Sequence, residues 1–133
     1  MTSVFISYSQ ADSEIASRVQ GALKDISISG WLDQADIAAG DSISSKVKES
    51  LKQANALIVL VSPSSLANKW VQFEVGAAFG MGKPIIPVII DSQSPDMVLP
   101  EWLNDYQYID ARNQPIDEVV NSIRLATNNP QHS

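Results

Sequence analysis

Hydrophobic and polar residues alternate with two different periods along the chain, and the changes of period predict where strands and helices lie. Five short runs rich in β-branched and aromatic residues predict strands at residues 4–8, 30–33, 56–61, 85–90 and 106–109. Four segments with apolar residues at helical spacing predict helices between and after these strands. The apolar positions that mark the helices are, in chain order, Ile15, Val19, Leu23 and Ile26; Ile43, Val47, Leu51 and Ala54; Leu66, Trp70, Phe73 and Ala77; and Ile116, Val119, Val120 and Ile123.

Residues at the ends of these segments indicate how each element begins and where it lies. Ser9 and Asp12 have the spacing of an S-x-x-D capping box for the first helix, and Ser62–Ser65 predicts the start of the third helix. The Ala56–Val61 run is apolar throughout, which is typical of a central strand buried on both faces. Pro87 places the fourth strand nearer a sheet edge or a bulge.

The alternation of strands and helices predicts an α/β fold. Repeated β-α-β units with right-handed crossovers give a parallel sheet with helices on both faces. Five strands of this size favour the flavodoxin-like three-layer fold with strand order 2-1-3-4-5, in which the first and third strands leave a crevice at their carboxyl ends. Residues 1–127 are expected to form this domain and residues 128–133 a polar tail. Functional residues are therefore expected near Tyr8–Asp12 and Ser62–Glu74.

Composition removes several classes of function. The 133 residues include no cysteine, which excludes thiol catalysis, zinc ribbons and iron–sulfur clusters. Fifteen acidic residues against nine basic ones, a net charge of -6, argue against a nucleic-acid surface. No apolar run approaches the roughly 20 residues that cross a bilayer, and no basic segment precedes a signal-like stretch. We expect a cytoplasmic domain that binds neither nucleic acid nor membrane.

Two activities known for such crevices do not fit the residues at the strand ends. Response-regulator receivers need acidic residues after the first strand, a phosphoacceptor Asp after the third and a Lys after the fifth. The corresponding strand ends here are Ser7-Tyr8-Ser9, Val61-Ser62-Pro63 and Ile109-Asp110. A flavodoxin phosphate loop is disfavoured because the segment after the first strand is acidic and lacks glycine. The one histidine, His132, lies in the tail, so neither a metal site nor a serine triad is expected.

One carboxylate stands out on the third predicted helix. Glu74 directly follows Phe73 and lies one turn after Trp70, with a mostly apolar stretch behind it. A Glu flanked by bulky apolar residues is not typical of a solvated helix face. The alternative is structural: Glu74 forms a salt bridge with Lys69 or caps a neighbouring loop.

Six motifs in order resemble the Toll/interleukin receptor (TIR) domain family, with details of its bacterial branch. The resemblance extends from Val4 to about Leu125. The motifs are Phe5-Ile6-Ser7-Tyr8-Ser9, Trp31-Leu32-Asp33, Gly40-Asp41, Val59-Leu60-Val61-Ser62-Pro63, Trp70-x-x-x-Glu74 and Gly82-Lys83-Pro84-Ile85-Ile86-Pro87-Val88.

The resemblance implies a reaction. Many TIR domains cleave NAD+ between nicotinamide and ribose, and the Glu of their W-x-x-x-E pattern, here Glu74, is the key catalytic residue. NAD+ would be the substrate, with no cofactor and no metal. The Gln34–Ser42 stretch corresponds to the family's BB loop, which gates the cleft and makes subunit contacts. The resemblance thus also implies self-association through that loop.

Further substrate-binding candidates lie around Glu74. Tyr8, Ser9 and Gln10 lead into the first helix, whose backbone N–H groups could bind the pyrophosphate, although Ser9 could equally be a plain helix cap. Trp70 could wall the ribose or nicotinamide, or pack in the core. Gly40 and Asp41 could bring the loop backbone close to the nucleotide, although glycine in a long loop needs no such reason.

Two hypotheses remain at this stage. The first is an NAD+ glycohydrolase that yields ADP-ribose or a cyclic form, acting as a bacterial defence effector and activated by self-assembly, with a fused or separate sensor domain. The second is a non-catalytic TIR–TIR interaction module for signalling. The W-x-x-x-E pattern favours the enzyme. The missing arginine and the absence of any second acid favour the module. Some catalytic relatives place an Arg after the F-I-S-Y segment and an acidic residue two before the loop glycine, where this chain has Ser9, Gln10 and Ala38, so affinity or product could differ.

Overall fold

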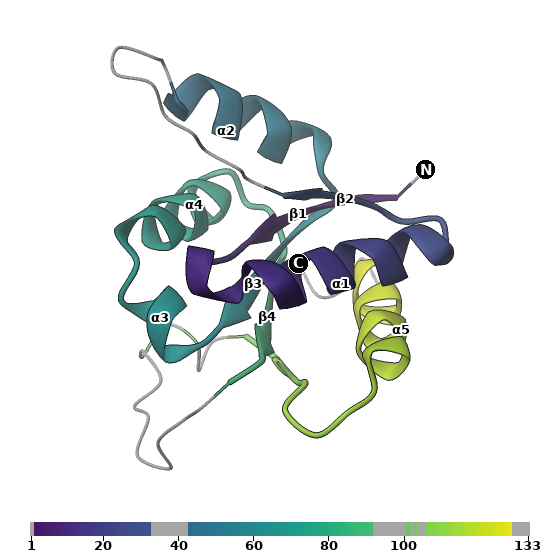
Figure 1. Cartoon of the computed structure of the whole chain (residues 1–133). Coiled ribbons are helices and arrows are strands. Elements are labelled where there is room, and N and C mark those ends of the chain that lie inside the picture. The colour runs from purple at the N-terminus through teal and green to yellow at the C-terminus, as the bar shows by residue number, and fades with distance from the viewer. Residues whose placement is uncertain (1, 33–42, 92–100, 102, 104–105, 129–133) are drawn as a thin grey trace.

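The computed structural model describes residues 2–32, 43–91, 101, 103 and 106–128 of the chain, with side chains of the second helix described from Val47 onward. The elements follow the predicted alternation (Figure 1). In chain order they are β1 (Ser3–Ser7), η1 (Gln10–Asp12), α1 (Ser13–Asp25), β2 (Ser29–Leu32), α2 (Ile43–Gln53), β3 (Ala56–Val61), α3 (Pro63–Leu66), α4 (Lys69–Gly80), β4 (Ile85–Ile89), β5 (Ile109–Asp110) and α5 (Ile116–Thr127).

The five strands form one parallel sheet in the order β2-β1-β3-β4-β5, which confirms the predicted fold class. β1 and β3 are neighbours, with Ser7 in register with Val59, and each leads into a different helix. This is the topological switch point of a doubly wound sheet, where the loops beyond the carboxyl ends of two adjacent strands diverge.

Helices cover both faces of the sheet, and β3 shows the consequence most clearly. Its residues alternate between two hydrophobic clusters: Ile58 packs with α1 and α5, whereas Val59 packs with α2 and α4. Figure 1 shows α1 and α5 together on one side of the sheet and α2 and α4 on the other. Every β3 residue is buried, which confirms the prediction of a central strand.

The third predicted helix is wrong in one respect, because the segment from Ser62 to Ala77 forms two helices. α3 is a single turn that ends at Leu66, and α4 begins after Asn68. The Asn68 side chain accepts hydrogen bonds from the backbone N–H groups of Trp70 (2.8 Å) and Val71 (3.1 Å), so it caps a new helix start. The direction of α4, and hence the place of Glu74, depends on this cap.

Local backbone geometry also determines where α4 ends. Gly82 adopts a left-handed backbone with φ of 70°, the conformation that glycine adopts without strain. The Lys83 N–H then donates to the carbonyl of Ala78, and the Gly82 N–H donates to the carbonyl of Phe79. These are the two hydrogen bonds of a Schellman motif. The chain therefore turns directly from α4 into β4.

The predictions for the last two strands hold in outline. β4 lies one strand from the sheet edge, and β5 pairs only with Val88 and Ile89, so this short partner strand does not extend to Pro87. β5 itself is Ile109–Asp110 rather than the predicted 106–109, and Tyr106 lies outside it. None of the helices within the described ranges combines the length and apolar character needed to cross a bilayer.

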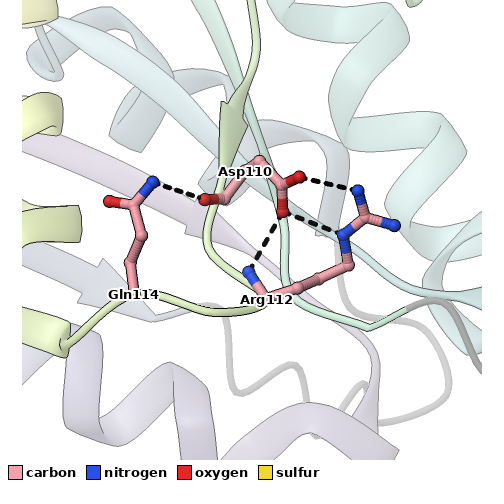
Figure 2. A network of polar contacts seen from close by, with 3 residues as sticks. All are labelled: Asp110, Arg112 and Gln114. Carbon is pink, nitrogen blue, oxygen red and sulfur yellow. Dashed lines mark hydrogen bonds and ion pairs between the residues drawn. The ribbon is translucent and has the colours of Figure 1, made fainter.

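A polar turn joins β5 to α5 (Figure 2). Arg112 donates three hydrogen bonds to the Asp110 carboxylate, from its backbone N–H, from Nε at 2.8 Å and from Nη2 at 2.6 Å. Gln114 donates to the Asp110 carbonyl at 2.8 Å. The hydrogen bonds from Arg112 lower the pKa of Asp110 from 3.8 to about 2.

We expect the contribution of Asp110 to stability to be small and to disappear in acid. A carboxyl whose pKa is lower in the folded state stabilises the protein above its unfolded pKa, and this stabilisation is lost as the pH falls through its folded pKa. The side chains of Asp110 and Arg112 are 44% and 41% exposed, so solvent screens this ion pair. Urea unfolding of wild type and Asp110→Asn should differ slightly and constantly from pH 5 to 8, and the difference should shrink between about pH 4 and 2. A difference that grows with acidity would contradict this account.

Candidate active site

The buried polar side chains of the described residues gather at one place in the fold. Besides the hydrophobic core, the buried side chains of the described residues are Ser7, Ser9, Ser62, Ser65 and Glu74. Ser7 ends β1 and Ser9 follows it, whereas Ser62 follows β3 and Ser65 lies on α3. Four hydroxyls and one carboxylate therefore meet at the carboxyl ends of β1 and β3, where the topology predicts a ligand crevice.

Glu74 reaches this place because it takes a core position on its helix. The buried residues of α4 are Val71, Glu74 and Ala78, a spacing that defines the inward face of a helix. Val71 and Ala78 pack into the cluster on the α2 and α4 side of the sheet, and Glu74 lies between them with 0% of its surface exposed. Lys69, by contrast, is exposed. The carboxylate is therefore part of the packed interior rather than of a solvated helix face.

Ser7 is a hydrogen-bond donor to this carboxylate. Its Oγ donates a 2.7 Å hydrogen bond to Glu74 Oε1, in a fully buried contact that joins the end of β1 to α4. Hydrogen bonds to an ionised acceptor are short and strong, and they are needed where a charge leaves water. Ser7 was not among the site residues predicted from the sequence. The available signal in the sequence was the alternation of the first strand, which places Ser7 on the same face as Phe5.

Tyr8, Ser9 and Gln10 do not form one surface. Tyr8, 9% exposed, packs in the hydrophobic cluster on the α1 and α5 side of the sheet. Ser9 is 2% exposed, and Gln10 is exposed at the start of η1. The strand alternation that directs Ser7 toward α4 directs Tyr8 to the opposite face. Ser7, rather than Tyr8, thus lies against Glu74.

The predicted capping box of Ser9 and Asp12 is wrong in detail. Neither residue caps a helix through its side chain; instead Ser9 Oγ bonds Asp12 Oδ2 at 3.0 Å. The capping box is formed one loop away, where Ser62 and Ser65 exchange side-chain and backbone hydrogen bonds at the start of α3. Asp12 accepts from the Ser62 hydroxyl at 2.5 Å, so local spacing missed a partner 50 residues distant.

Trp70 lies one turn before Glu74 and is half-buried. Its ring stacks on Phe73 with a centroid distance of 5.3 Å and an interplanar angle of 29°. It also packs against the core cluster on the α2 and α4 side. The packing interpretation of Trp70 is therefore supported, while its role toward a substrate stays a prediction. Gly40, Asp41 and the Gln34–Ser42 stretch lie outside the described residues.

A cavity of about 370 Å³ lies along α4. Its lining is mainly apolar, and Glu74 is not part of it. The lining residues are Val59, Ser65, Leu66, Val71, Gln72, Val75, Gly76, Phe79, Ile85 and Tyr106. Among the described residues, Ser65 is the buried polar side chain that this cavity shares with the strand ends.

The fold and the buried carboxylate agree with a comparison against known families. The profile of the TIR domain family matches residues 4–124, nearly the whole chain. The chain belongs to the TIR domain family. The resemblance found in the sequence motifs is thereby confirmed.

Named relatives of this TIR domain include two enzymes. It is 27% identical over 126 residues to the 2′ cyclic ADP-D-ribose synthase BtTIR of Bacteroides thetaiotaomicron, covering 90% of this chain and 44% of the relative. It is 23% identical over 104 residues to the probable 2′ cyclic ADP-D-ribose synthase BdTIR of Brachypodium distachyon, covering 77% and 46%. The chain thus spans less than half the length of either relative.

The fold of this TIR domain also matches a solved structure. The TIR domain of the Toll-related receptor TRR-2 from Hydra magnipapillata superimposes with a TM-score of 0.76 at 20% identity. The match covers 95% of this chain and 98% of that one. It supports the fold assignment.

We expect Ser7→Ala to destabilise this TIR domain by about 1–3 kcal/mol, because it removes a hydrogen bond from a buried carboxylate. Urea unfolding at pH 7 measures the loss. The matched control is Ser17→Ala on the exposed face of α1, which should change the free energy of unfolding by less than about 0.5 kcal/mol. Equal stability of the two variants would show that the Ser7 hydroxyl does not stabilise the Glu74 carboxylate.

Proposed function

We propose that this TIR domain cleaves NAD+ at the bond between nicotinamide and ribose, with Glu74 as the catalytic carboxylate. The observation that carries the proposal is the burial of Glu74 at the switch point of the sheet, against Ser7. A charge in a core position costs free energy, so such a residue is a functional-site candidate. The named activities of BtTIR and BdTIR support the same reaction class.

One carboxylate suffices for this chemistry. Nicotinamide leaves a cationic pyridinium as a neutral molecule, so the general acid that O-glycosidases need is dispensable. Glu74 would stabilise the oxocarbenium charge that develops on the ribose and accept hydrogen bonds from the ribose hydroxyls. Water would then add to the ribose carbon that nicotinamide has left and release one proton to solvent, giving ADP-ribose. Addition of a hydroxyl of the same molecule, with loss of its proton, would give a cyclic form. The names of the two relatives favour a cyclic product.

The burial of Glu74 also imposes a condition on the reaction. With 0% of its surface exposed, the carboxylate cannot touch a ribose until neighbouring atoms move aside. The proposed reaction therefore includes an opening step before cleavage. A water-excluding site of this kind strengthens the electrostatic effect of the carboxylate once the substrate is bound.

The other predicted substrate contacts carry less weight. The Ser9 hydroxyl is already held by Asp12 and by Ser64, so it would bind a phosphate only after these contacts break. Backbone N–H groups near Gln10 and the loop residues Gly40 and Asp41 stay in the proposal as phosphate and ribose contacts. Trp70 stays in it as a wall of the site.

Assembly belongs to the proposal as well. In the catalytic TIR domains that this chain resembles, a neighbouring subunit's loop completes the cleft, and the corresponding stretch here is Gln34–Ser42. We propose self-association through this stretch, driven by a fused or separate sensor domain. A bacterial defence effector in the cytoplasm is the role that this arrangement fits.

Glu74→Gln should lower nicotinamide release at least about a hundredfold, because it removes the negative charge opposite the oxocarbenium while keeping an oxygen for Ser7. Concentrated protein is incubated with NAD+ and nicotinamide is quantified by chromatography. The matched control is Glu118→Gln on the exposed face of α5, which should keep wild-type activity. Thermal unfolding of the variant should shift by only a few degrees.

Two results would contradict the proposal. One is full activity of Glu74→Gln. The other is no nicotinamide from wild type even at high concentration, under crowding and in an enforced assembly, which would favour the non-catalytic interaction module.

We expect the rate per subunit to rise with protein concentration, because the cleft would be completed by a second copy. Nicotinamide release is measured over a dilution series beside sedimentation analysis. Gly40→Pro should lower this rate by restricting the loop backbone. A rate per subunit that stays constant while the protein changes from monomer to oligomer would contradict the role of assembly.

A further inference from the structure

A single carboxylate joins the loop after β1 to the turn after β3. Asp12 Oδ2 lies 3.0 Å from Ser9 Oγ and 2.5 Å from Ser62 Oγ. A carboxylate oxygen offers only acceptor sites, so both hydroxyls donate to it. Ser9 Oγ also lies 3.0 Å from Ser64 Oγ, which forms a second bridge between the same two loops.

The two bridges restrict the ends of both strands at the crevice. Ser62 is 1% exposed and caps α3 by accepting from the Ser65 N–H at 3.1 Å, so its one proton is available for Asp12. Ser9 is likewise buried and has its one proton directed to the same oxygen. Each hydroxyl is thus held in one rotamer by partners on both sides.

This network lies two residues from the Glu74 contact. Ser7 holds Glu74 Oε1, and Ser9 follows in the same extended segment after β1. A displacement of Ser9 would therefore be passed to Ser7 through one intervening residue. Tyr8, that residue, is packed in the core on the other face of the sheet, which leaves the segment little freedom to absorb a shift.

We propose that Asp12 is a positioning residue for the reaction at Glu74. The inference rests on the proposed function and adds a residue outside the W-x-x-x-E pattern. Asp12 fixes the two loops that frame the crevice, and through Ser9 it keeps Ser7 and the Glu74 carboxylate in place. Positioning errors of about 1 Å can cost up to about a hundredfold in rate, so a group without substrate contact can control turnover.

The test compares Asp12→Ala with Asp12→Asn. Alanine removes both bonds, whereas asparagine keeps a carbonyl oxygen that can accept from Ser62 and Ser9. We expect Asp12→Ala to lower kcat for nicotinamide release about tenfold, with KM within about twofold of wild type. The kcat of Asp12→Asn should lie between those of wild type and Asp12→Ala. Ser64→Ala, which removes only the outer bridge, should give a smaller decrease.

The matched control is Glu14→Ala, which removes an exposed carboxylate from the first turn of α1, the helix that follows Asp12. It should keep wild-type kcat, which would exclude a general effect of charge at the start of α1. Wild-type kcat in both Asp12 variants would overturn the proposal. A change confined to KM would also overturn it, because positioning of the reacting carboxylate acts on kcat.

A second measurement is independent of activity. Amide hydrogen exchange by NMR should be faster at Ser62 and Ser65 in Asp12→Ala, and unchanged at Leu51 on α2, which packs on the other side of the sheet from α1. Unchanged exchange at Ser62 and Ser65 would overturn the bridge. If wild type releases no nicotinamide, the proposed reaction fails while this measurement still decides whether Asp12 holds the two loops together. If Asp12→Ala does not fold, Asp12→Asn and Ser64→Ala carry both tests.

Discussion

The bond between Ser7 and Glu74 is the constraint on which the arrangement of this site depends. A carboxylate has been placed where the helix pattern calls for an apolar residue, between Val71 and Ala78. Removing an ionised group from water costs several kcal/mol unless hydrogen bonds replace its hydration. The 2.7 Å hydrogen bond from Ser7 replaces part of it, and it also ties α4 to the end of β1. The packing of α4 and the geometry proposed for catalysis thus depend on the same contact.

The layered core explains how two distant segments come to share this place. β1 and β4 pair with the two edges of β3, and the helices divide between its two faces, so that β3 is buried on both. β1 and β3 then end side by side while their following helices lead away from each other. Polar side chains that leave these two strand ends meet in the gap, as Asp12 and Ser62 do across 50 residues of sequence. The topology creates the crevice, and only then do the hydroxyls and carboxylates give it chemistry.

Sequence reasoning predicted the elements whose signals are local and missed contacts that depend on tertiary structure. The continuous apolar run of β3 identified a central strand, and the strand order followed from the alternation of elements. The break before α4 was missed because Trp70 and Phe73 continue the apolar spacing across it, whereas the Asn68 cap decides the outcome. Ser9 and Asp12 have the spacing of a cap, but a buried hydroxyl on the neighbouring loop outcompetes the backbone N–H as partner. Glu74 could be singled out from its apolar neighbours, while its partner Ser7 required the fold.

The burial of Glu74 bears on the choice between an enzyme and an interaction module. A surface that only binds another protein gains affinity from exposed side chains, and α4 offers these in Phe73 and Phe79, 38% and 70% exposed. Such a surface gains nothing from a carboxylate in the core beneath it, and an apolar residue there would avoid the desolvation cost. A reaction that develops positive charge does gain, because a preorganised anion shielded from water acts most strongly on that charge. The exposed aromatic residues and the buried carboxylate lie on different faces of α4, so the proposed reaction at Glu74 and the proposed self-association through the Gln34–Ser42 stretch are compatible in one domain.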